Sequence, residues 1–251
     1  LLYGEPVRIV EAKDDWVRVL AEEQPDFFQE NKWQGYPGWV DADTLRFMPQ
    51  PNPNVVVRTK QALLQNGSDM MLLSVGTRLA RVSDEKGLSM VRLREGSLAE
   101  IASDALYVLP DHVTEESRAQ IIKTAELFLG TSYYWGGRSG IQADLSIGVD
   151  CSGLVSLAYR VHGMDIPRDS HEQKLKARMI ENSDMKAADL VFLTEPNDPK
   201  RITHVMIYTG GDGGIESRKS SGRVLRSSFK ERFSRPLTDI KSGSEILDHS
   251  F

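Results

Sequence analysis

The sequence lacks most of what disulfide-bonded, metal-binding and membrane-spanning proteins require. Its single cysteine, Cys151, excludes an intrachain disulfide and a zinc site built from several cysteines. No apolar run approaches the roughly 20 residues that a membrane-spanning helix needs. Lys and Arg number 31 against 36 Asp and Glu, for a net charge of -5. Nucleic acid is therefore not an expected partner.

The composition is that of a folded protein with more than one compact unit. Apolar residues make up 40% of the sequence and charged residues 27%, which is ordinary for globular proteins. A length of 251 residues exceeds that of one typical domain, so we expect two or three units. The numbering opens at Leu1 rather than at Met. We expect that a preceding segment, such as a signal peptide or a lipid anchor, is missing.

The first 110 residues have the pattern of short antiparallel strands. Apolar and polar residues alternate in Pro6–Val10, Trp16–Leu20 and Gly38–Val40, which indicates a small β-barrel over residues 1–48. Three prolines between residues 49 and 53 then mark a stiff connection. Short apolar segments separated by glycines continue over residues 54–110, and they predict a second small β-unit.

After residue 110 the pattern becomes helical and then returns to strands. Thr114 is a candidate N-cap for a helix that ends before Gly130. A second helix is predicted from Cys151 to about His162, with Asp150 as its cap. Two strands are predicted over residues 190–193 and 203–208, the second entering a glycine-rich turn. Residues 114–251 therefore read as an α+β unit.

The predicted position of Cys151 suits a nucleophile. A thiol attacks an amide only as a thiolate, and a helix N-terminus or a nearby imidazolium favours that form. The unpaired N–H groups of the first helical turn can also stabilise the oxyanion that forms on attack. From placement alone, a small buried side chain with no chemical role is an equally good reading of a lone cysteine.

Five motifs in the α+β unit resemble those of a known family. In order they are Tyr133-Tyr134-Trp135-Gly136-Gly137, Asp150-Cys151-Ser152-Gly153-Leu154-Val155, Pro167-Arg168-Asp169-Ser170, Asp189-Leu190-Val191-Phe192 and His204-Val205-Met206-Ile207-Tyr208. This series resembles the NlpC-type cell-wall cysteine peptidases, a papain-like group. The two preceding units resemble bacterial SH3 domains, as arranged in the γ-D-glutamyl-diamino-acid endopeptidases. The expected fold is thus two SH3-like barrels followed by an α+β papain-like domain.

The resemblance implies a catalytic set of Cys151, His204 and Glu216. His204 matches the family's general base, and Glu216 matches the residue that orients the imidazole. Family members commonly carry histidine at the third position, so glutamate is a departure, although a carboxylate can also accept the ring N–H. Glu216 faces His204 only if the intervening hairpin loop has an odd number of residues; a two-residue Asp212-Gly213 turn would put it on the wrong face. A solvated glutamate is the alternative.

The remaining histidines have weaker cases as the base. They lie at a predicted helix end, after the Asp169-Ser170 motif, or in connecting and terminal sequence: His162, His171, His112 and His249.

The resemblance also implies a set of substrate contacts. A stem peptide with a free amino end needs acids for its ammonium and donors for its carboxylate. The candidates are Tyr36, Glu5, Tyr133, Trp135, Asp150, Ser152, Asp169 and Ser170. Helix capping is the ordinary alternative for the four residues in the Asp-Ser pairs, and surface positions for Tyr36 and Glu5. An Arg138–Val149 insert and a C-terminal basic stretch add features that the motifs do not explain; a solvated face is the usual origin of the latter.

We therefore expect an endopeptidase that hydrolyses the γ-D-glutamyl to diamino-acid bond of peptidoglycan stem peptides with a free N-terminal L-Ala. No metal or cofactor is required, and a monomer located outside the cytoplasm, secreted or periplasmic, is expected. One alternative is a murein-binding protein whose peptidase site has decayed. Another is an amidase or acyltransferase that uses the same thiolate. The identity of the diamino acid, diaminopimelate or lysine, is left open, as is the choice between peptide recycling and wall remodelling.

Overall fold

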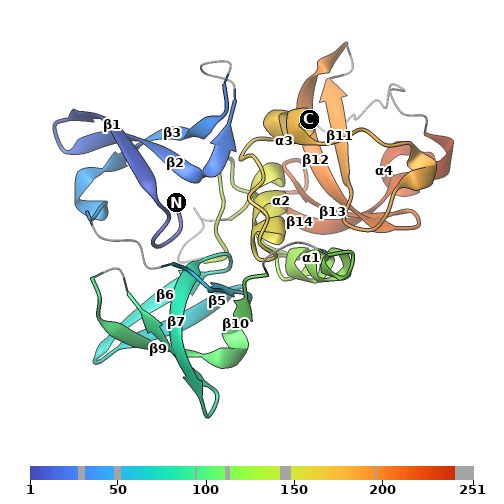
Figure 1. The fold of residues 1–251 in the computed structure, drawn as a ribbon. Helices are drawn as coiled ribbons and strands as arrows, with labels where there is room; N and C mark the ends of the chain where they lie inside the picture. The colour runs from blue at the N-terminus through green and yellow to red at the C-terminus, as the bar shows by residue number, and fades with distance from the viewer. Residues whose placement is uncertain are drawn as a thin grey trace.

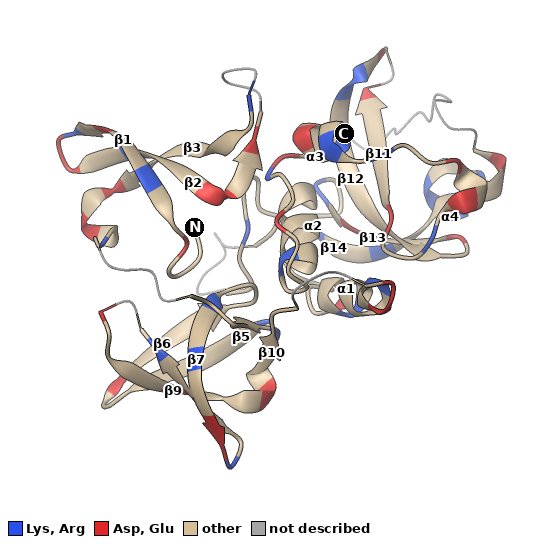
Figure 2. Ribbon diagram, viewed as in Figure 1, with Lys and Arg blue, Asp and Glu red and all other residues tan. Residues whose placement is uncertain are grey.

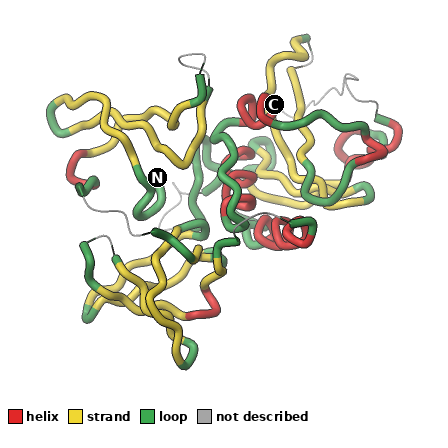
Figure 3. The backbone as a smooth tube through the Cα atoms, in the orientation of Figure 1, coloured by secondary structure: helices red, strands yellow, loops and turns green. Residues whose placement is uncertain are grey.

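The computed structural model describes residues 1–27, 32–47, 52–93, 95–110, 114–141, 148–195 and 197–240. They form three units, which we number in chain order: the first covers residues 1–47, the second 52–110 and the third 114–240 (Figure 1). His112, His249 and residues 142–147 of the insert lie outside the described residues. The N-terminus lies between the units (Figure 1). Helices are concentrated in the third unit (Figure 3), and both signs of charge occur on all three (Figure 2).

The first unit is a three-stranded antiparallel sheet in the order β1-β2-β3. Its strands are β1 (Val7–Lys13), β2 (Trp16–Asp26) and β3 (Gln34–Asp41). Val17, Val19 and Ala21 of β2 are buried at alternate positions, as the sequence pattern predicts for a covered sheet face, and Leu20 is buried on the opposite face as well. All three strands predicted for this region are thus confirmed, each longer than its apolar run.

The second unit contains a seven-stranded sheet in the order β10-β4-β7-β8-β9-β5-β6. The strands are β4 (Val55–Val57), β5 (Gln61–Asn66), β6 (Asp69–Ser74), β7 (Arg78–Glu85), β8 (Leu88–Arg92), β9 (Leu98–Ala102) and β10 (Leu106–Val108). Their inward side chains form a separate apolar core that includes Leu64, Leu73 and Ile101. These short strands agree with the β-unit that the sequence predicts for this region.

The third unit packs helices on both faces of a four-stranded antiparallel sheet, β11-β12-β13-β14. Its elements are α1 (Glu116–Glu126), α2 (Cys151–Arg160), α3 (Ser170–Lys176), β11 (Leu190–Glu195), β12 (Asp198–Gly210), β13 (Gly213–Arg218), β14 (Arg223–Ser228) and α4 (Phe229–Phe233). Val205 and Ile207 of β12 face a core shared with α1 and α2. Met206 and Tyr208 face a second core with α4. No helix among the described residues has the length and apolar character to cross a bilayer.

Helix α1 differs at both ends from the prediction. It begins at Glu116, because Thr114 does not cap it: the Thr114 N–H donates to Ser117 Oγ, and the Ser117 N–H donates back to the Thr114 carbonyl. This local turn replaces the first helical turn. Residues after Glu126 continue as turns to Gly130, which has a φ of 80°. The helical spacing of apolar residues thus continues beyond the C-terminal end of the regular helix.

An apolar contact joins the three units around α2. Leu2 of the first unit and Val56 and Val75 of the second belong to the same core as the helices of the third. Gly76 lies at the tightest point: a Cβ there would meet Leu157 Cδ2 at 3.0 Å, and its φ of +83° is the left-handed region that glycine favours. The turn between β6 and β7 therefore packs directly against α2.

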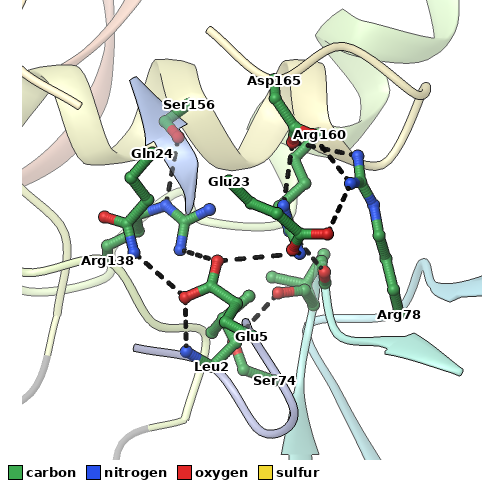
Figure 4. Close-up of polar contacts among 12 residues, drawn as sticks. Leu2, Glu5, Glu23, Gln24, Ser74, Arg78, Arg138, Ser156, Arg160 and Asp165 are labelled. Atoms are coloured by element: carbon green, nitrogen blue, oxygen red, sulfur yellow. Dashed lines mark hydrogen bonds and ion pairs between the residues drawn. The ribbon is translucent and has the colours of Figure 1, made fainter. Parts of the chain in front are cut away.

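Six charged side chains cross the same junction, and we call them the junction cluster (Figure 4). They are Glu5, Glu23, Arg78, Arg138, Arg160 and Asp165. Three carboxylates face three guanidinium groups, and all three units contribute. Because the charges balance, each buried ion has opposite partners to offset its loss of hydration.

Arg160, at the C-terminal end of α2, is the centre of the junction cluster. Its side chain is 2% exposed and contacts Glu23 Oε2 at 2.5 Å and Asp165 Oδ1 at 2.8 Å. Its Nε–H donates to the Gly76 carbonyl at 2.8 Å. One side chain of the third unit thus binds both of the other units, which fixes their positions relative to α2.

Candidate active site

Cys151 is the first residue of α2, as predicted, and Asp150 caps the helix. Asp150 Oδ1 accepts the Gly153 N–H at 2.7 Å. Gly153 is required here, because a Cβ would lie 2.1 Å from the Gly137 carbonyl oxygen. The chain segments before and after Cys151 can therefore approach closely only with glycine at position 153. The thiol lies at the positive end of the helix dipole.

His204 of β12 makes a side-chain hydrogen bond with Glu216 of β13, and it lies close enough to Cys151 for the thiol to raise its pKa. The His204 Nε2 to Glu216 Oε2 distance is 2.6 Å. Since Nε2 is used by Glu216, Nδ1 is the ring nitrogen left for the sulfur. The structure thus brings together the three side chains that the sequence analysis placed in one set.

A β-bulge decides which face of the hairpin Glu216 occupies. Gly210 pairs with Gly213 across a two-residue turn, and the register then shifts, so that Tyr208 pairs with Gly214 and Ile207 with Ile215. Without the shift, Glu216 would point away from His204. The five residues between Tyr208 and Gly214 satisfy the odd-loop condition, although the tight turn itself is Gly211-Asp212 rather than Asp212-Gly213.

Opposite charges stabilise the ionised forms of His204 and Glu216. Burial lowers the pKa of His204, but its hydrogen bonds and the charges of Cys151 and Glu216 outweigh burial and raise that pKa to about 9. Burial likewise raises the pKa of Glu216, and His204, Arg218 and Arg232 outweigh it and lower the pKa to about 2. An imidazolium beside a carboxylate is therefore the stable state at neutral pH.

The raised pKa of His204 predicts a loss of stability in alkali. A pKa of about 9 against the ordinary 6.5 means that the contribution of protonated His204 is complete below pH 6.5 and is lost as the pH rises through 9. We expect a loss on the order of 3 kcal/mol over this interval, seen as a fall in thermal midpoint by calorimetry. A His204→Asn variant should lack this fall. If the thermal midpoint falls with pH to the same extent in both proteins, the raised pKa does not belong to His204.

Asp150 and Ser152 are held by protein groups rather than open to a ligand. Arg168 donates to both oxygens of Asp150, at 3.0 and 2.9 Å, and to Ser152 Oγ at 3.0 Å. The Gly136 N–H also donates to Asp150. We therefore assign Asp150 and Ser152 to the support of the α2 N-terminus and leave them out of the proposed substrate contacts.

Tyr36 and Asp169 meet across the boundary between the first and third units. The Tyr36 hydroxyl donates to Asp169 Oδ2 at 3.1 Å. Burial and the Asp169 carboxylate raise the pKa of Tyr36 to about 12, and burial also raises the pKa of Asp169. Asp169 precedes α3 but makes no side-chain capping bond, and its side chain remains 48% exposed. Its Oδ1 lies 3.7 Å from Arg168 Nη1, so a positively charged group of a ligand would bind the exposed part of Asp169 beside this guanidinium.

Three further residues of the predicted set are Tyr133, Trp135 and Ser170. Tyr133 is half-buried, and burial together with the charge of Cys151 raises its pKa. Trp135 is 77% exposed. Lys219 Nζ lies 5.9 Å from the Trp135 ring centroid. Ser170 is the first residue of α3. An exposed indole is available for contact with a ligand.

Glu5 does not lie where a substrate contact was expected. Its side chain is 1% exposed and pairs with Arg138 at 2.7 Å in the junction cluster. Its second oxygen accepts from the Leu2 N–H and from Gln24. A substrate amino group would have to displace these partners, so we leave Glu5 out of the proposed substrate contacts as well.

Of the other described histidines, His162 contacts α1. His162 Nε2 bonds Thr124 Oγ1 at 3.0 Å, and burial lowers the pKa of His162. It is a buried structural histidine that links α1 to the segment after α2. His171 is the second residue of α3.

The large cavity of the third unit is separate from this site. It has a volume of about 750 Å³ and is lined by residues of α3, β11 and α4, with neither Cys151 nor His204 among them. The chemistry therefore belongs to the surface around Cys151 rather than to this cavity.

Three arginines with contacts at the site were not singled out from the sequence. Arg168 lies inside a quoted motif, and its spacing from Asp150 gave no sign of a contact. Arg218 and Arg232 belong to the C-terminal basic stretch, which we read as a solvated face. The structure corrects this reading for these two residues, because both contact the buried Glu216.

Known proteins resemble the chain over most of its length. The γ-D-glutamyl-L-lysine dipeptidyl-peptidase of Bacillus subtilis is 33% identical over 89% of this chain and 73% of its own. The protein with the same description from Bacillus cereus is 31% identical over 89% of this chain and 68% of its own. The crystal structure of an NlpC/P60 family protein from Bacillus cereus superposes with a TM-score of 0.79 at 29% identity, covering 91% of this chain and 75% of that one.

These observations first define the class of protein. A cysteine at a helix N-terminus, paired with a histidine from an antiparallel sheet, is the arrangement of papain-like cysteine peptidases. The family model described as NlpC/P60 matches residues 130–241, which include all three site residues. The chain belongs to the NlpC/P60 family and is a peptidase.

Proposed function

We propose that the protein hydrolyses the bond between γ-D-glutamate and the diamino acid of peptidoglycan stem peptides that begin with a free L-Ala. The names of the two Bacillus relatives describe removal of a dipeptide at a γ-D-glutamyl bond to lysine. The observation that carries the proposal is the Cys151–His204–Glu216 set, with the Tyr36–Asp169 pair beside it.

In this reaction Cys151 and His204 share one proton. The Cys151 thiolate attacks the γ-carbonyl carbon, and N–H groups at the start of α2 stabilise the oxyanion. Protonated His204 gives its proton to the leaving amine, and the C–N bond breaks to leave a thioester. His204 then takes a proton from water, whose oxygen attacks the thioester and releases the γ-D-glutamyl product. Glu216 holds the imidazole in the required orientation throughout.

The Tyr36–Asp169 pair suits the amino end of the substrate. An N-terminal dipeptide is released only if the free ammonium of the substrate lies two residues before the cleaved bond. Asp169 supplies the negative charge, and Tyr36 binds one of its oxygens, which fixes the other. We assign the half-buried Tyr133 and the exposed Trp135 to further contacts with the peptide, and the Ser170 hydroxyl to the free carboxylate of the glutamate.

The first two units fit this function as SH3-like domains. We assign the first to residues 1–48, the second to 54–110 and the peptidase domain to 114–251. The first unit then completes the substrate pocket through Tyr36. The substrate lies in the cell wall, so we propose a secreted or periplasmic monomer. The connected Cys151–His204–Glu216 set favours catalysis over a murein-binding protein with a decayed site.

The amino-end proposal predicts a strong preference for a free L-Ala. Purified protein is incubated with L-Ala-γ-D-Glu-diaminopimelate, with the lysine analogue, and with both peptides N-acetylated, and released products are followed by mass spectrometry. We expect acetylation to lower kcat/KM by roughly 100-fold, because it removes the charge that pairs with Asp169. Equal cleavage of free and acetylated peptides would contradict the pocket assignment.

A Tyr36→Phe variant tests the same pocket. Loss of its hydrogen bond to the Asp169 carboxylate should raise KM by roughly tenfold with little change in kcat. Tyr107→Phe in β10 is the matched control, since it removes a hydroxyl from a residue packed against the core beneath α2. No release from either peptide by the parent protein would overturn the function as a whole.

A further inference from the structure

Two arginines of the C-terminal basic stretch point inward. The stretch comprises Arg218, Lys219, Arg223, Arg226, Lys230, Arg232 and Arg235. The Arg232 side chain is 4% exposed and the Arg218 side chain 20%, and both contact Glu216, whose side chain has no exposed surface. A buried arginine loses hydration, so its contact with Glu216 must offset a real cost.

The two oxygens of the Glu216 carboxylate contact His204 of the catalytic set and three residues outside that set. Oε2 accepts from His204 Nε2 at 2.6 Å and lies 3.0 Å from Arg232 Nη1. Oε1 accepts from Arg218 Nη2 at 2.6 Å and from the Ser227 hydroxyl. His204 and Arg232 therefore share one oxygen, and the arginines compete with the imidazolium for the same negative charge.

The fold holds Arg232 in this position through α4. Ser228 Oγ caps the helix by accepting the Glu231 N–H, and Phe229 and Phe233 are buried in the core on that face of the sheet. The Arg232 guanidinium also lies 5.2 Å from the Phe233 ring centroid. The approach of Arg232 to Glu216 is thus set by a capped and anchored helix rather than by a free surface side chain.

We propose that Arg232 and Arg218 are positioning residues that act on His204 through Glu216, because they partly neutralise the negative charge of its carboxylate. This inference rests on the proposed role of His204. A buried carboxylate with no other partner would hold an imidazolium tightly and make it a weak acid toward the leaving amine. The arginines reduce the negative charge that Glu216 presents to the imidazolium, so that His204 can still release its proton.

The charges around the pair agree with this role. The groups that face Glu216 come from every neighbouring element: His204 from β12, Arg218 from β13, Ser227 from β14 and Arg232 from α4, with Cys151 of α2 beyond His204. The charges of ionised Cys151, protonated His204 and ionised Glu216 sum to -1. The two arginines change this sum to +1. They therefore favour the anionic sulfur and disfavour retention of the proton on His204.

The test is the ring titration of His204, followed by NMR in the full chain and assigned with His204→Asn. Arg232→Gln should raise the titration midpoint by about one pH unit, because a positive charge near the imidazolium is removed. Arg232→Lys keeps the positive charge, so its midpoint should stay close to that of the parent. Arg235→Gln is the matched control, since Arg235 is an exposed residue of the same basic stretch, and it should leave the midpoint unchanged.

Kinetics with the stem peptide provide a second readout. Arg232→Gln should lower kcat about tenfold with KM little changed, since only proton donation to the leaving amine is impaired. If that variant does not fold, Arg218→Gln, at a less buried position, tests the same charge. An unshifted His204 midpoint in a folded variant, or a shift as large in Arg232→Lys, overturns the inference. Failure of the parent to cleave stem peptides would instead overturn the proposed function, because the NMR midpoint needs no substrate.

Discussion

Replacement of Cys151 by alanine is expected to lower kcat/KM on stem peptides by on the order of 10⁴-fold or more. No other residue in the chain can supply a thiolate, because Cys151 is the only cysteine in the sequence. Removing the sulfur leaves His204 with Glu216 but without the atom that forms the thioester. Product release over time, by mass spectrometry, measures the loss.

The same single thiol supplies the control for this experiment. Iodoacetamide should modify one equivalent of the parent and abolish its activity, with no incorporation into Cys151→Ala. The variant should stay folded and unfold in one cooperative thermal transition, because alanine fits the space of the small side chain at the helix start. Cleavage by folded Cys151→Ala at the parental rate would show that the nucleophile lies elsewhere.

Replacement of Glu5 by glutamine is expected to destabilise the protein by roughly 3–5 kcal/mol. Glu5 is the buried partner of Arg138 at 2.7 Å and lies 3.6 Å from Arg160 (Figure 4). Burial raises the pKa of Glu5, but these arginines outweigh burial and lower that pKa to about 2, so the group is ionised at neutral pH. Glutamine keeps the shape and removes the charge, which leaves Arg138 and Arg160 buried with too few opposite charges.

Urea unfolding at pH 7 measures this loss of stability. Glu22→Gln is the matched control, because Glu22 is an exposed carboxylate in the same unit, and its effect should stay within about 0.5 kcal/mol. If the free energy of unfolding of Glu5→Gln lies within about 1 kcal/mol of that of the parent, the junction cluster does not contribute to stability in the way that its burial indicates.

Local sequence pattern was sufficient to predict the parts of the site that one segment determines. The N-cap by Asp150, the start of α2 at Cys151 and the strand that carries His204 all follow from short-range signals such as capping residues and apolar spacing. Family motifs then identified which of the five histidines pairs with the sulfur. The end of α1 was harder, because the apolar spacing continues through turns that are no longer helical.

Contacts between distant segments could not be read from the sequence. Glu5 and Arg138 are 133 residues apart, and their pairing depends on how the first unit packs on the third. Charge alone also failed to separate the buried Arg232 from the exposed Arg235 three residues later, because the capped helix α4 decides which one faces Glu216. The face of Glu216 depended on a register shift that the glycine-rich turn allows but does not specify.

Helix α2 carries the Cys151 sulfur at its N-terminal end and Arg160 at its C-terminal end, nine residues further along the same helix. The partners of Arg160 include Glu23 of the first unit and the Gly76 carbonyl of the second. A chimera that keeps only the third unit would thus leave Arg160 with Asp165 as its one remaining counter-ion among the junction cluster, at the end of the helix that carries the nucleophile. Transplanting the active portion onto foreign modules would require carrying over Glu5, Glu23 and Arg78 as a matched set.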